Sequence, residues 1–202
     1  MAMLQAPLTP RDHRRGDPDA PVVLVEYGDY QCPHCAAAEP VVEALLQGFR
    51  RDLQGVFRHF PLSEIHPLSE IAAQALEFAG AHGAFWPMHR AVFANQARLT
   101  VPMIFAIAGA LNLPQPALRQ ALESGTYRAR VREDFIGGVK SGVNGTPCFF
   151  VNGVRHDEAH SFEALSAAIF AARALIDARS GPVLGAGRQA DAGPGARPPS
   201  PS

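Results

Sequence analysis

The sequence predicts an α/β fold into which a block of helices is inserted. Three observations support this prediction: a strand, a helix and a strand follow one another early in the chain, several helices come next, and a hairpin and a last helix end the pattern. A strand–helix–strand unit implies a right-handed crossover between parallel strands. The helical block is too long to be a simple connection, so we expect it to form an inserted subdomain.

The first elements follow a polar lead-in, residues 1–20, which carries proline and glycine and in which no element is predicted. Residues 22–25 form a short β-branched run bounded by a proline and a glycine, as is typical of a buried strand. A helix is expected after Cys35, and Pro40 should kink it because proline lacks a backbone donor. The alternating residues 55–60 predict a second strand.

Four or five helices are predicted between residues 63 and 140, where apolar side chains recur at helical spacing. Pro67 suits the first turn of one helix, Thr100 suits the N-cap of another, and Gly125 suits a helix end.

The strand pattern returns at residues 149–151, and Asn152-Gly153 after it is a strong hairpin-turn signal. A final helix is expected to begin with Ser161 as its cap. Residues 180–202 are rich in glycine, proline and alanine, so we expect a disordered tail that cannot bury enough apolar surface to fold.

The composition excludes several classes of protein. The chain has 202 residues, of which 47% are hydrophobic and 18% charged, and its formal net charge is −1, so no basic excess favours nucleic acid. No run of 18 apolar residues predicts a membrane span, and the first 20 residues lack the apolar core of a secretory signal. We therefore expect a cytoplasmic protein, unless a signal has been removed.

The strongest chemical signal is the Cys32-Pro33-His34-Cys35 motif, which lies between a predicted strand and a predicted helix. A thiol at a helix N-terminus faces free backbone N–H groups and the positive end of the helix dipole, so its pKa falls. Cys32 is then the attacking thiolate, and Cys35, one turn later, can resolve a mixed disulfide. Pro33 fixes the backbone of the first turn, and His34 can lower the pKa of Cys32 further.

Other interpretations of the cysteines remain open at this point. A zinc site needs four ligands, which Cys148 and a histidine could complete. A structural disulfide across so short a loop would remove little chain entropy. Three cysteines are too few for a disulfide scaffold, and in a reducing cytosol a close thiol pair is more often catalytic or metal-binding.

Several segments together resemble the thioredoxin superfamily, and within it the DsbA-like thiol–disulfide oxidoreductases: VLVEYGDYQCPHC, Pro40, AFWPMHRAVFANQ and GVNGTPCFFVNG. The resemblance spans about residues 12–178. It implies a thioredoxin fold, which is a central mixed β-sheet flanked by helices, with an inserted all-helical subdomain. The thioredoxin-fold domain would comprise residues 21–62 and 141–179, and the insertion residues 63–140.

The resemblance also implies roles for residues outside the motif. Pro147 would be cis and face the cysteine pair, and the backbone of Thr146 would bind an extended substrate; an ordinary trans turn is the alternative. Glu26 would be a buried acid that relays a proton from Cys35, although a carboxylate exposed at a strand end is equally compatible. Cys148 departs from the family pattern. It is interpreted first as a small buried hydrophobe and second as a third redox thiol.

We thus expect an enzyme that exchanges disulfides with protein or peptide thiols and is recycled by a redox partner. No cofactor or metal is expected, because the cysteine pair is itself the redox group. The direction, oxidase against reductase or isomerase, stays open. The alternative is a non-enzymatic metal-binding or redox-sensing module that uses Cys32, Cys35 and Cys148.

Overall fold

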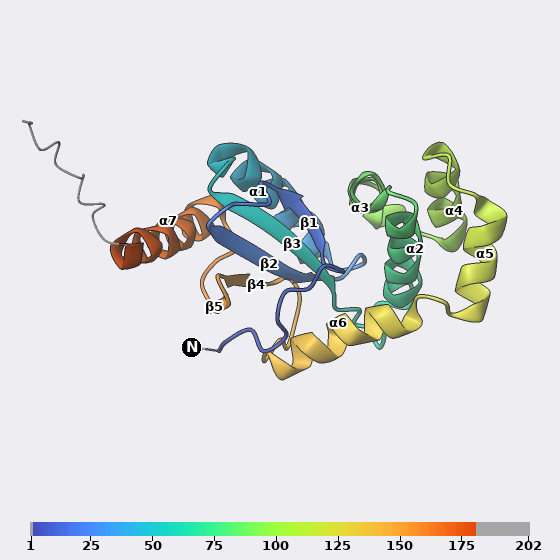
Figure 1. Ribbon diagram of the computed structural model, residues 1–202. Helices are drawn as coiled ribbons and strands as arrows, with labels where there is room; N and C mark the ends of the chain where they lie inside the picture. The colour runs from blue at the N-terminus through green and yellow to red at the C-terminus, as the bar shows by residue number, and fades with distance from the viewer. Residues whose placement is uncertain (1, 181–202) are drawn as a thin grey trace, which may run out of the picture.

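The computed structural model describes residues 2–180, apart from the side chain of Ser180 (Figure 1). The elements run in the order β1 (His13–Gly16), β2 (Val22–Gly28), α1 (Pro33–Phe49), β3 (Leu53–His59), α2 (Ser69–Ala81), α3 (Phe85–Ala94), the 3₁₀ turn η1 (Gln96–Arg98), α4 (Val101–Ala110), α5 (Gln115–Ser124), α6 (Arg128–Lys140), β4 (Cys148–Val151), β5 (Val154–His156) and α7 (Phe162–Ser180). The predicted tail lies outside the described residues except for Ser180, which ends α7.

The five strands form one mixed sheet in the order β1-β3-β2-β4-β5. The central pair β2 and β3 is parallel, as the strand–helix–strand pattern predicts, and every other pair is antiparallel. Both residues of the Asn152-Gly153 turn between β4 and β5 have positive φ, 45° and 81°, which suits a tight hairpin. The predicted fold class, a mixed sheet flanked by helices with a helical insertion, is confirmed.

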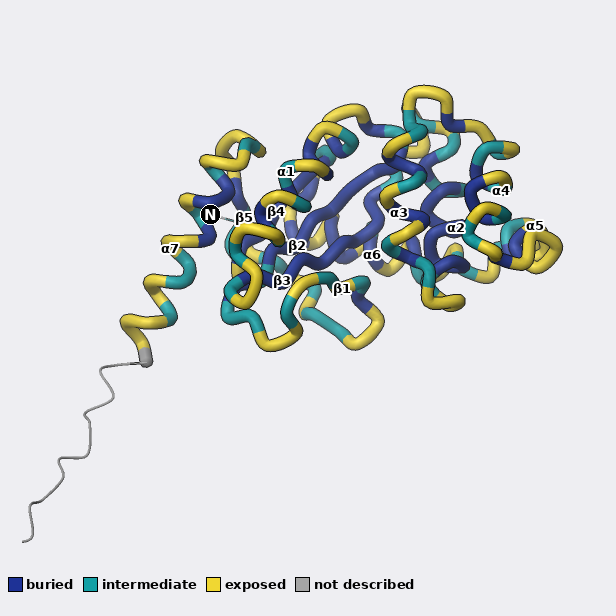
Figure 2. Tube along the Cα trace, turned by 90° about the horizontal axis from the view of Figure 1, so that it is seen from above, coloured by how far each residue is buried: buried dark blue, intermediate teal, exposed yellow. Residues whose placement is uncertain are grey.

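Helices cover both faces of the sheet (Figure 1). Apolar residues of α1 and α7 pack against Leu24 of β2 and Phe149 of β4, whereas α6 packs on the opposite face against Tyr27 and Phe60. A Cβ at Gly138 of α6 would lie 2.7 Å from the Phe60 ring, so glycine permits this close approach. The central strands β2 and β3 are almost wholly buried and appear dark blue in Figure 2.

The helical insertion lies at one end of the sheet (Figure 1) and shares a core with the start of α1. That core contains the two cysteines of the motif together with buried residues of α2, α3 and α4. The predicted caps are present: Thr100 accepts a bond from the Met103 N–H at 3.2 Å, and Ser161 accepts one from the Ala164 N–H at 3.2 Å. The reactive motif therefore lies where the sheet meets the insertion.

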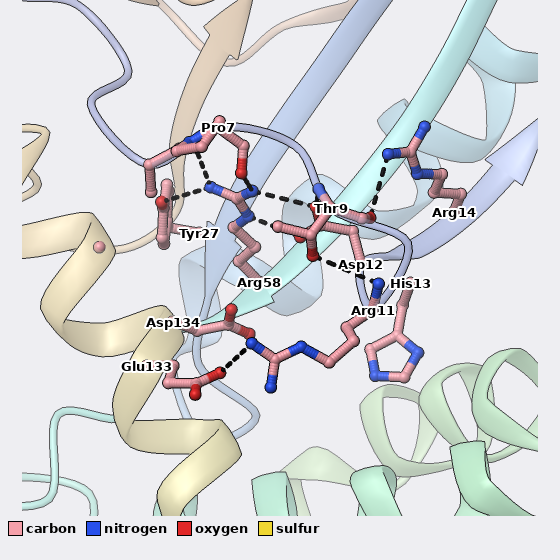
Figure 3. A network of polar contacts seen from close by, with 12 residues as sticks. Pro7, Thr9, Arg11, Asp12, His13, Arg14, Tyr27, Arg58, Glu133 and Asp134 are labelled. Atoms are coloured by element: carbon pink, nitrogen blue, oxygen red, sulfur yellow. Dashed lines mark hydrogen bonds and ion pairs between the residues drawn. The ribbon is translucent and has the colours of Figure 1, made fainter.

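The structure adds one strand that the sequence analysis did not predict. β1 lies within residues 1–20, the predicted lead-in, and pairs with β3. The segment before it crosses the sheet and is held by Arg58, whose guanidinium bonds the carbonyls of Ala6 and Pro7 and the carboxylate of Asp12 (Figure 3). The first residues are thus built into the fold.

Candidate active site at the start of helix α1

Cys32 is the N-cap residue of α1, and Pro33 is the first helical residue, where the missing backbone donor costs nothing. The Cys32 side chain is buried, with only 4% of its surface exposed. Its Sγ lies 3.2 Å from the carbonyl oxygen of Thr146, in the loop before β4. The fold thus brings two segments, separated by more than a hundred residues, into contact at one sulfur.

The surroundings of Cys32 favour the thiolate. A hydrogen bond from the Cys35 side chain is the largest cause that lowers the pKa of Cys32, to about 5, and it outweighs the opposing effect of burial. The side chain of Thr146 and the backbone N–H groups of Cys35 and His34 lower the pKa further. His34 thus acts through its backbone N–H, while its imidazole is exposed.

Cys35 has the opposite character. Its side chain is fully buried, and this burial, together with its hydrogen bond to Cys32 and the nearby Glu26 carboxyl, raises the pKa of its thiol far above the usual value. The backbone N–H of Asp29 donates to its Sγ at 3.4 Å. Both thiols are free, so the structure shows the reduced pair. One thiol is poised as an anion, and the other holds its proton.

Glu26 lies on β2, on the face that α1 covers, and is 3% exposed. Burial raises the pKa of its carboxyl to about 8, helped by the charges of Glu39 and Cys32 and opposed by Arg15. Its Oε1 has no hydrogen-bond partner within the described residues. Of the two interpretations left open by the sequence, the structure thus shows the buried acid, and a carboxyl that is protonated near pH 7 can supply a proton.

Polar groups of the loop and of the helical insertion hold the turn before α1. The carboxylate of Asp29 accepts bonds from the Gln31 and Leu62 N–H groups, at 2.7 and 2.8 Å, and from the His66 ring at 2.9 Å. The side-chain amide of Gln96 in η1 donates to the carbonyls of Tyr30 and Cys32, at 3.1 and 2.8 Å. The loop after β3 and the 3₁₀ turn η1 of the insertion together hold the turn that ends at Cys32, which we call the cysteine turn.

A buried chain of polar groups runs behind α1. Tyr30 hydrogen-bonds the His89 ring at 2.9 Å, and His89 Nε2 lies 3.2 Å from a carboxylate oxygen of Glu39. Burial lowers the pKa of His89 to about 4, so this ring is neutral near pH 7. Glu39 in turn forms a bidentate pair with Arg15 of β1 at 2.7 Å. These residues are spread over positions 15 to 89 of the sequence, so no local sequence motif identifies the chain of contacts.

The Thr146–Pro147 peptide bond is cis and lies directly opposite Cys32. Beside it is a hollow of about 250 Å³ with a largely polar lining that includes Asn144, Arg155, His156, Asp157 and His160. A substrate chain that pairs with the Thr146 backbone could place a neighbouring side chain there.

Cys148 belongs to the other face of the sheet. It packs with Tyr27, Phe60 and Phe150 on the side of α6, while its neighbour Phe149 faces α1. It is 4% exposed, and burial raises the pKa of its thiol. Cys148 also lines the polar hollow beside Pro147, so it lies between this apolar cluster and that hollow.

A nucleophilic thiol at a helix N-terminus, with a buried partner thiol and a buried acid, defines the class of thiol–disulfide oxidoreductases. The family model described as Thioredoxin matches residues 8–171, and the chain belongs to this thioredoxin family.

Solved structures with the same fold include BdbD from Bacillus subtilis, with a TM-score of 0.77, 22% identity and coverage of 85% of this chain and 97% of that one. A thioredoxin-like oxidoreductase from Silicibacter pomeroyi DSS-3 has a TM-score of 0.72 and 25% identity over 82% of this chain and 94% of its own. Wolbachia pipientis α-DsbA1 has a TM-score of 0.75 and 22% identity, over 88% and 98% of the two chains. The DsbA-like resemblance predicted from the sequence is confirmed.

Curated proteins that match this chain in sequence are named as antiporters, not as oxidoreductases. The Na(+)/H(+) antiporter NhaA 1 of Salinispora arenicola is 45% identical over 170 residues, which are 84% of this chain and 26% of the relative. NhaA 1 of Mycobacterium sp. strain KMS is 43% identical over 171 residues, or 81% and 28%. The chain thus spans about a quarter of the length of these relatives. Among residues 2–180, no helix has the length and apolar character needed to cross a membrane.

Proposed function

We propose that this chain catalyses dithiol–disulfide exchange with protein substrates through Cys32 and Cys35. The observation that carries the proposal is the opposite shift of two neighbouring thiols, with the pKa of Cys32 lowered to about 5 and that of Cys35 raised. A thiol with so low a pKa is ionised at pH 7, and the thiolate is the species that attacks and leaves in exchange.

In the oxidising direction, a substrate thiolate attacks Sγ of Cys32 in the Cys32–Cys35 disulfide. A mixed disulfide forms, and the sulfur of Cys35 leaves and takes up a proton, which the neutral carboxyl of Glu26 can supply. A second substrate thiolate then attacks the substrate sulfur of the mixed disulfide. Cys32 leaves as a stable thiolate, the substrate gains one disulfide, and the enzyme gains two electrons.

The backbone of Thr146 is proposed to align the substrate. Its carbonyl contacts the Cys32 sulfur, and an extended peptide that adds as a short strand beside this loop would bring its own sulfur into line. No external cofactor takes part in exchange, because the electrons pass between sulfur atoms.

The direction of exchange depends on the redox partner and on the compartment. Stabilisation of the Cys32 thiolate stabilises the reduced enzyme, which makes its disulfide a stronger oxidant. In an oxidising compartment the chain would therefore donate disulfides. In a reducing compartment the thiol pool would keep the pair reduced and favour reduction or isomerisation.

The antiporter name of the relatives does not conflict with this proposal. The matched region is about a quarter of those proteins, and it is the region that folds here as a thioredoxin-like domain. We propose that the same exchange chemistry accompanies the transporter in those longer relatives. The alternative of a three-cysteine metal or sensor module has no geometric support, because Cys148 packs on the other face of the sheet.

Equilibration with glutathione mixtures, followed by alkylation of the remaining thiols, measures the reduction potential of the pair. We expect a potential more oxidising than the thioredoxin value of about −270 mV. Refolding of a reduced, unfolded substrate measures activity, and Cys32→Ser should abolish it. A wild-type protein that exchanges no faster than free glutathione would refute the proposed function.

A further inference from the structure

A second cluster of ligand-type side chains lies apart from the cysteines. His13 of β1 and His59 of β3 each point Nε2 at the same carboxylate oxygen, Oε1 of Glu77 in α2, at 2.9 and 3.0 Å. One ligand atom from each of these three residues lies within 4.8 Å of the other two. We propose that His13, His59 and Glu77 form a binding site for a divalent transition-metal ion, with zinc as the best-matched ion.

The β1–β3 pairing creates the two-histidine half of this site. His13 lies opposite Phe57, and His59 is two residues further along β3, so both imidazoles lie on one face of the sheet. That face receives α2, from which Glu77 projects. The three residues are 46 and 18 positions apart and form no sequence motif, so the sequence alone does not bring them together.

The donor set and its geometry suit zinc. Two imidazole nitrogens and one carboxylate oxygen are the protein ligands of many zinc sites that keep a fourth position open. Ligand atoms about 2.1 Å from zinc in a tetrahedron lie about 3.4 Å from each other. The two observed nitrogen–oxygen separations, 2.9 and 3.0 Å, need to grow by a few tenths of an ångström, and the two histidine nitrogens lie within 4.8 Å of each other.

The rings are held in place before any ion binds. The His13 ring stacks on Phe85 at a centroid distance of 3.5 Å and an angle of 8°, and Phe57 and Phe85 pack edge-on against His59. Gly80 leaves room for the His13 ring, because a Cβ there would lie 2.8 Å from its Cε1. The His13 side chain is 15% exposed, so the site has a side that faces solvent.

The charges around the cluster allow a dication. Arg130 Nε is 3.9 Å from the same Glu77 oxygen, but its guanidinium already pairs with Asp134. Two other arginines of these strands are also paired, Arg15 with Glu39 and Arg58 with Asp12 (Figure 3). The rings of His13 and His59 are therefore the main partners of the Glu77 carboxylate.

An ion at this site would join the sheet to the helical insertion. β1 and β3 belong to the sheet and α2 to the insertion, and the cysteine motif lies at the same junction. The ion would therefore stabilise the arrangement that presents Cys32, without touching the sulfur chemistry.

The oxidised protein is the right sample for the test, because its disulfide prevents Cys32 and Cys35 from binding metal. Titration with Zn²⁺ against a chromophoric chelator should show one equivalent bound, and thermal unfolding should shift upward with Zn²⁺. Co²⁺ in the same sample should give visible bands without sulfur charge-transfer absorption.

Three variants make the test specific. His13→Gln and Glu77→Gln keep hydrogen-bonding groups but remove a ligand, so each should weaken Zn²⁺ binding by more than about tenfold. Glu77 lies in α2, so Glu77→Gln could weaken binding by disturbing the fold. His13→Gln lies on the edge strand β1 and tests the same site independently. His82→Ala removes an exposed histidine and should bind as the wild type does. A wild type that takes up no zinc, or equal binding by His13→Gln, would overturn the proposal.

Discussion

At the scale of single residues, position decides chemistry. Cys32 and Cys35 are three residues apart, yet their pKa values move in opposite directions, because Cys32 receives hydrogen bonds from Cys35 and from backbone N–H groups, whereas burial dominates at Cys35. The sequence could predict the nucleophile because the motif is local. The hydrogen bond from His34 that lowers the pKa of Cys32 comes from its backbone N–H, while its imidazole is exposed.

The pH profile of alkylation tests this account of Cys32. We expect the rate of iodoacetamide labelling to rise with a midpoint near pH 5. Cys35→Ala removes the largest cause of the low pKa, so its midpoint should move upward. His34→Ala retains the backbone N–H and should move the midpoint less. An equal or larger shift in His34→Ala would show that the imidazole dominates.

Glu26 should make stability depend on pH. Its folded pKa of about 8 lies above the ordinary 4.5, so the folded chain holds a proton that the unfolded chain has lost. This contribution is fully present below pH 4.5 and is lost as pH rises through 8, at about 1.4 kcal/mol per pH unit. The free energy of unfolding of Glu26→Gln minus that of the wild type should therefore increase from pH 5 to pH 8.

Urea unfolding at several pH values measures this difference. Glu64→Gln changes an exposed carboxyl and serves as the control, for which the difference from wild type should stay flat. A flat difference for Glu26→Gln as well would mean that its carboxyl titrates normally.

At the scale of elements, local signals predicted β2, α1, β4 and the final hairpin, because each has a strong apolar run, a cap or a turn pair. β1 carries the sequence HRRG, which has no β-branched or apolar residue. It is a strand because its side chains find partners in the folded chain. Arg15, for example, pairs with Glu39 and Glu43 of α1. Such tertiary partners are invisible in a single sequence.

The 3₁₀ turn η1 illustrates how the insertion serves the site. Gln96→Ala would remove both bonds to the carbonyls of Tyr30 and Cys32. We expect a loss of about 1–2 kcal/mol in free energy of unfolding and slower exchange, since the cysteine turn loses its restraint. Gln120→Ala, at an exposed position of α5, should change neither quantity. Unchanged stability and exchange in Gln96→Ala would show that the turn holds itself.

At the scale of the whole molecule, the first residues of the chain are fixed by a buried ion pair. Arg58 and Asp12 have side chains that are 3% and 2% exposed and lie 2.8 Å apart. Burial opposes ionisation of Asp12, but its hydrogen bond with Arg58 leaves its pKa below the usual 3.8. The carboxylate thus stabilises the fold above pH 3.8, and this stabilisation is lost as pH falls through the lower folded pKa.

Asp12→Asn should therefore destabilise the protein strongly at pH 7. It leaves a buried guanidinium without its counter-ion, which costs about 3–5 kcal/mol. Asp19→Asn, at an exposed position, is the matched control for urea unfolding. A loss below about 1 kcal/mol for Asp12→Asn would show that Tyr27 and the two carbonyls suffice for Arg58.

The pairing of Leu24 with Val151 joins chain segments that are synthesised far apart. Closing so large a loop is entropically costly, so β4 should join β2 late during folding. Until then the Cys32 thiol lacks its contact with the Thr146 carbonyl, and the active site is incomplete. Pulse-labelling hydrogen exchange should show that the amides of β2 and β3 are protected before those of β4. The active site around Cys32 would then form only when β4 pairs with β2.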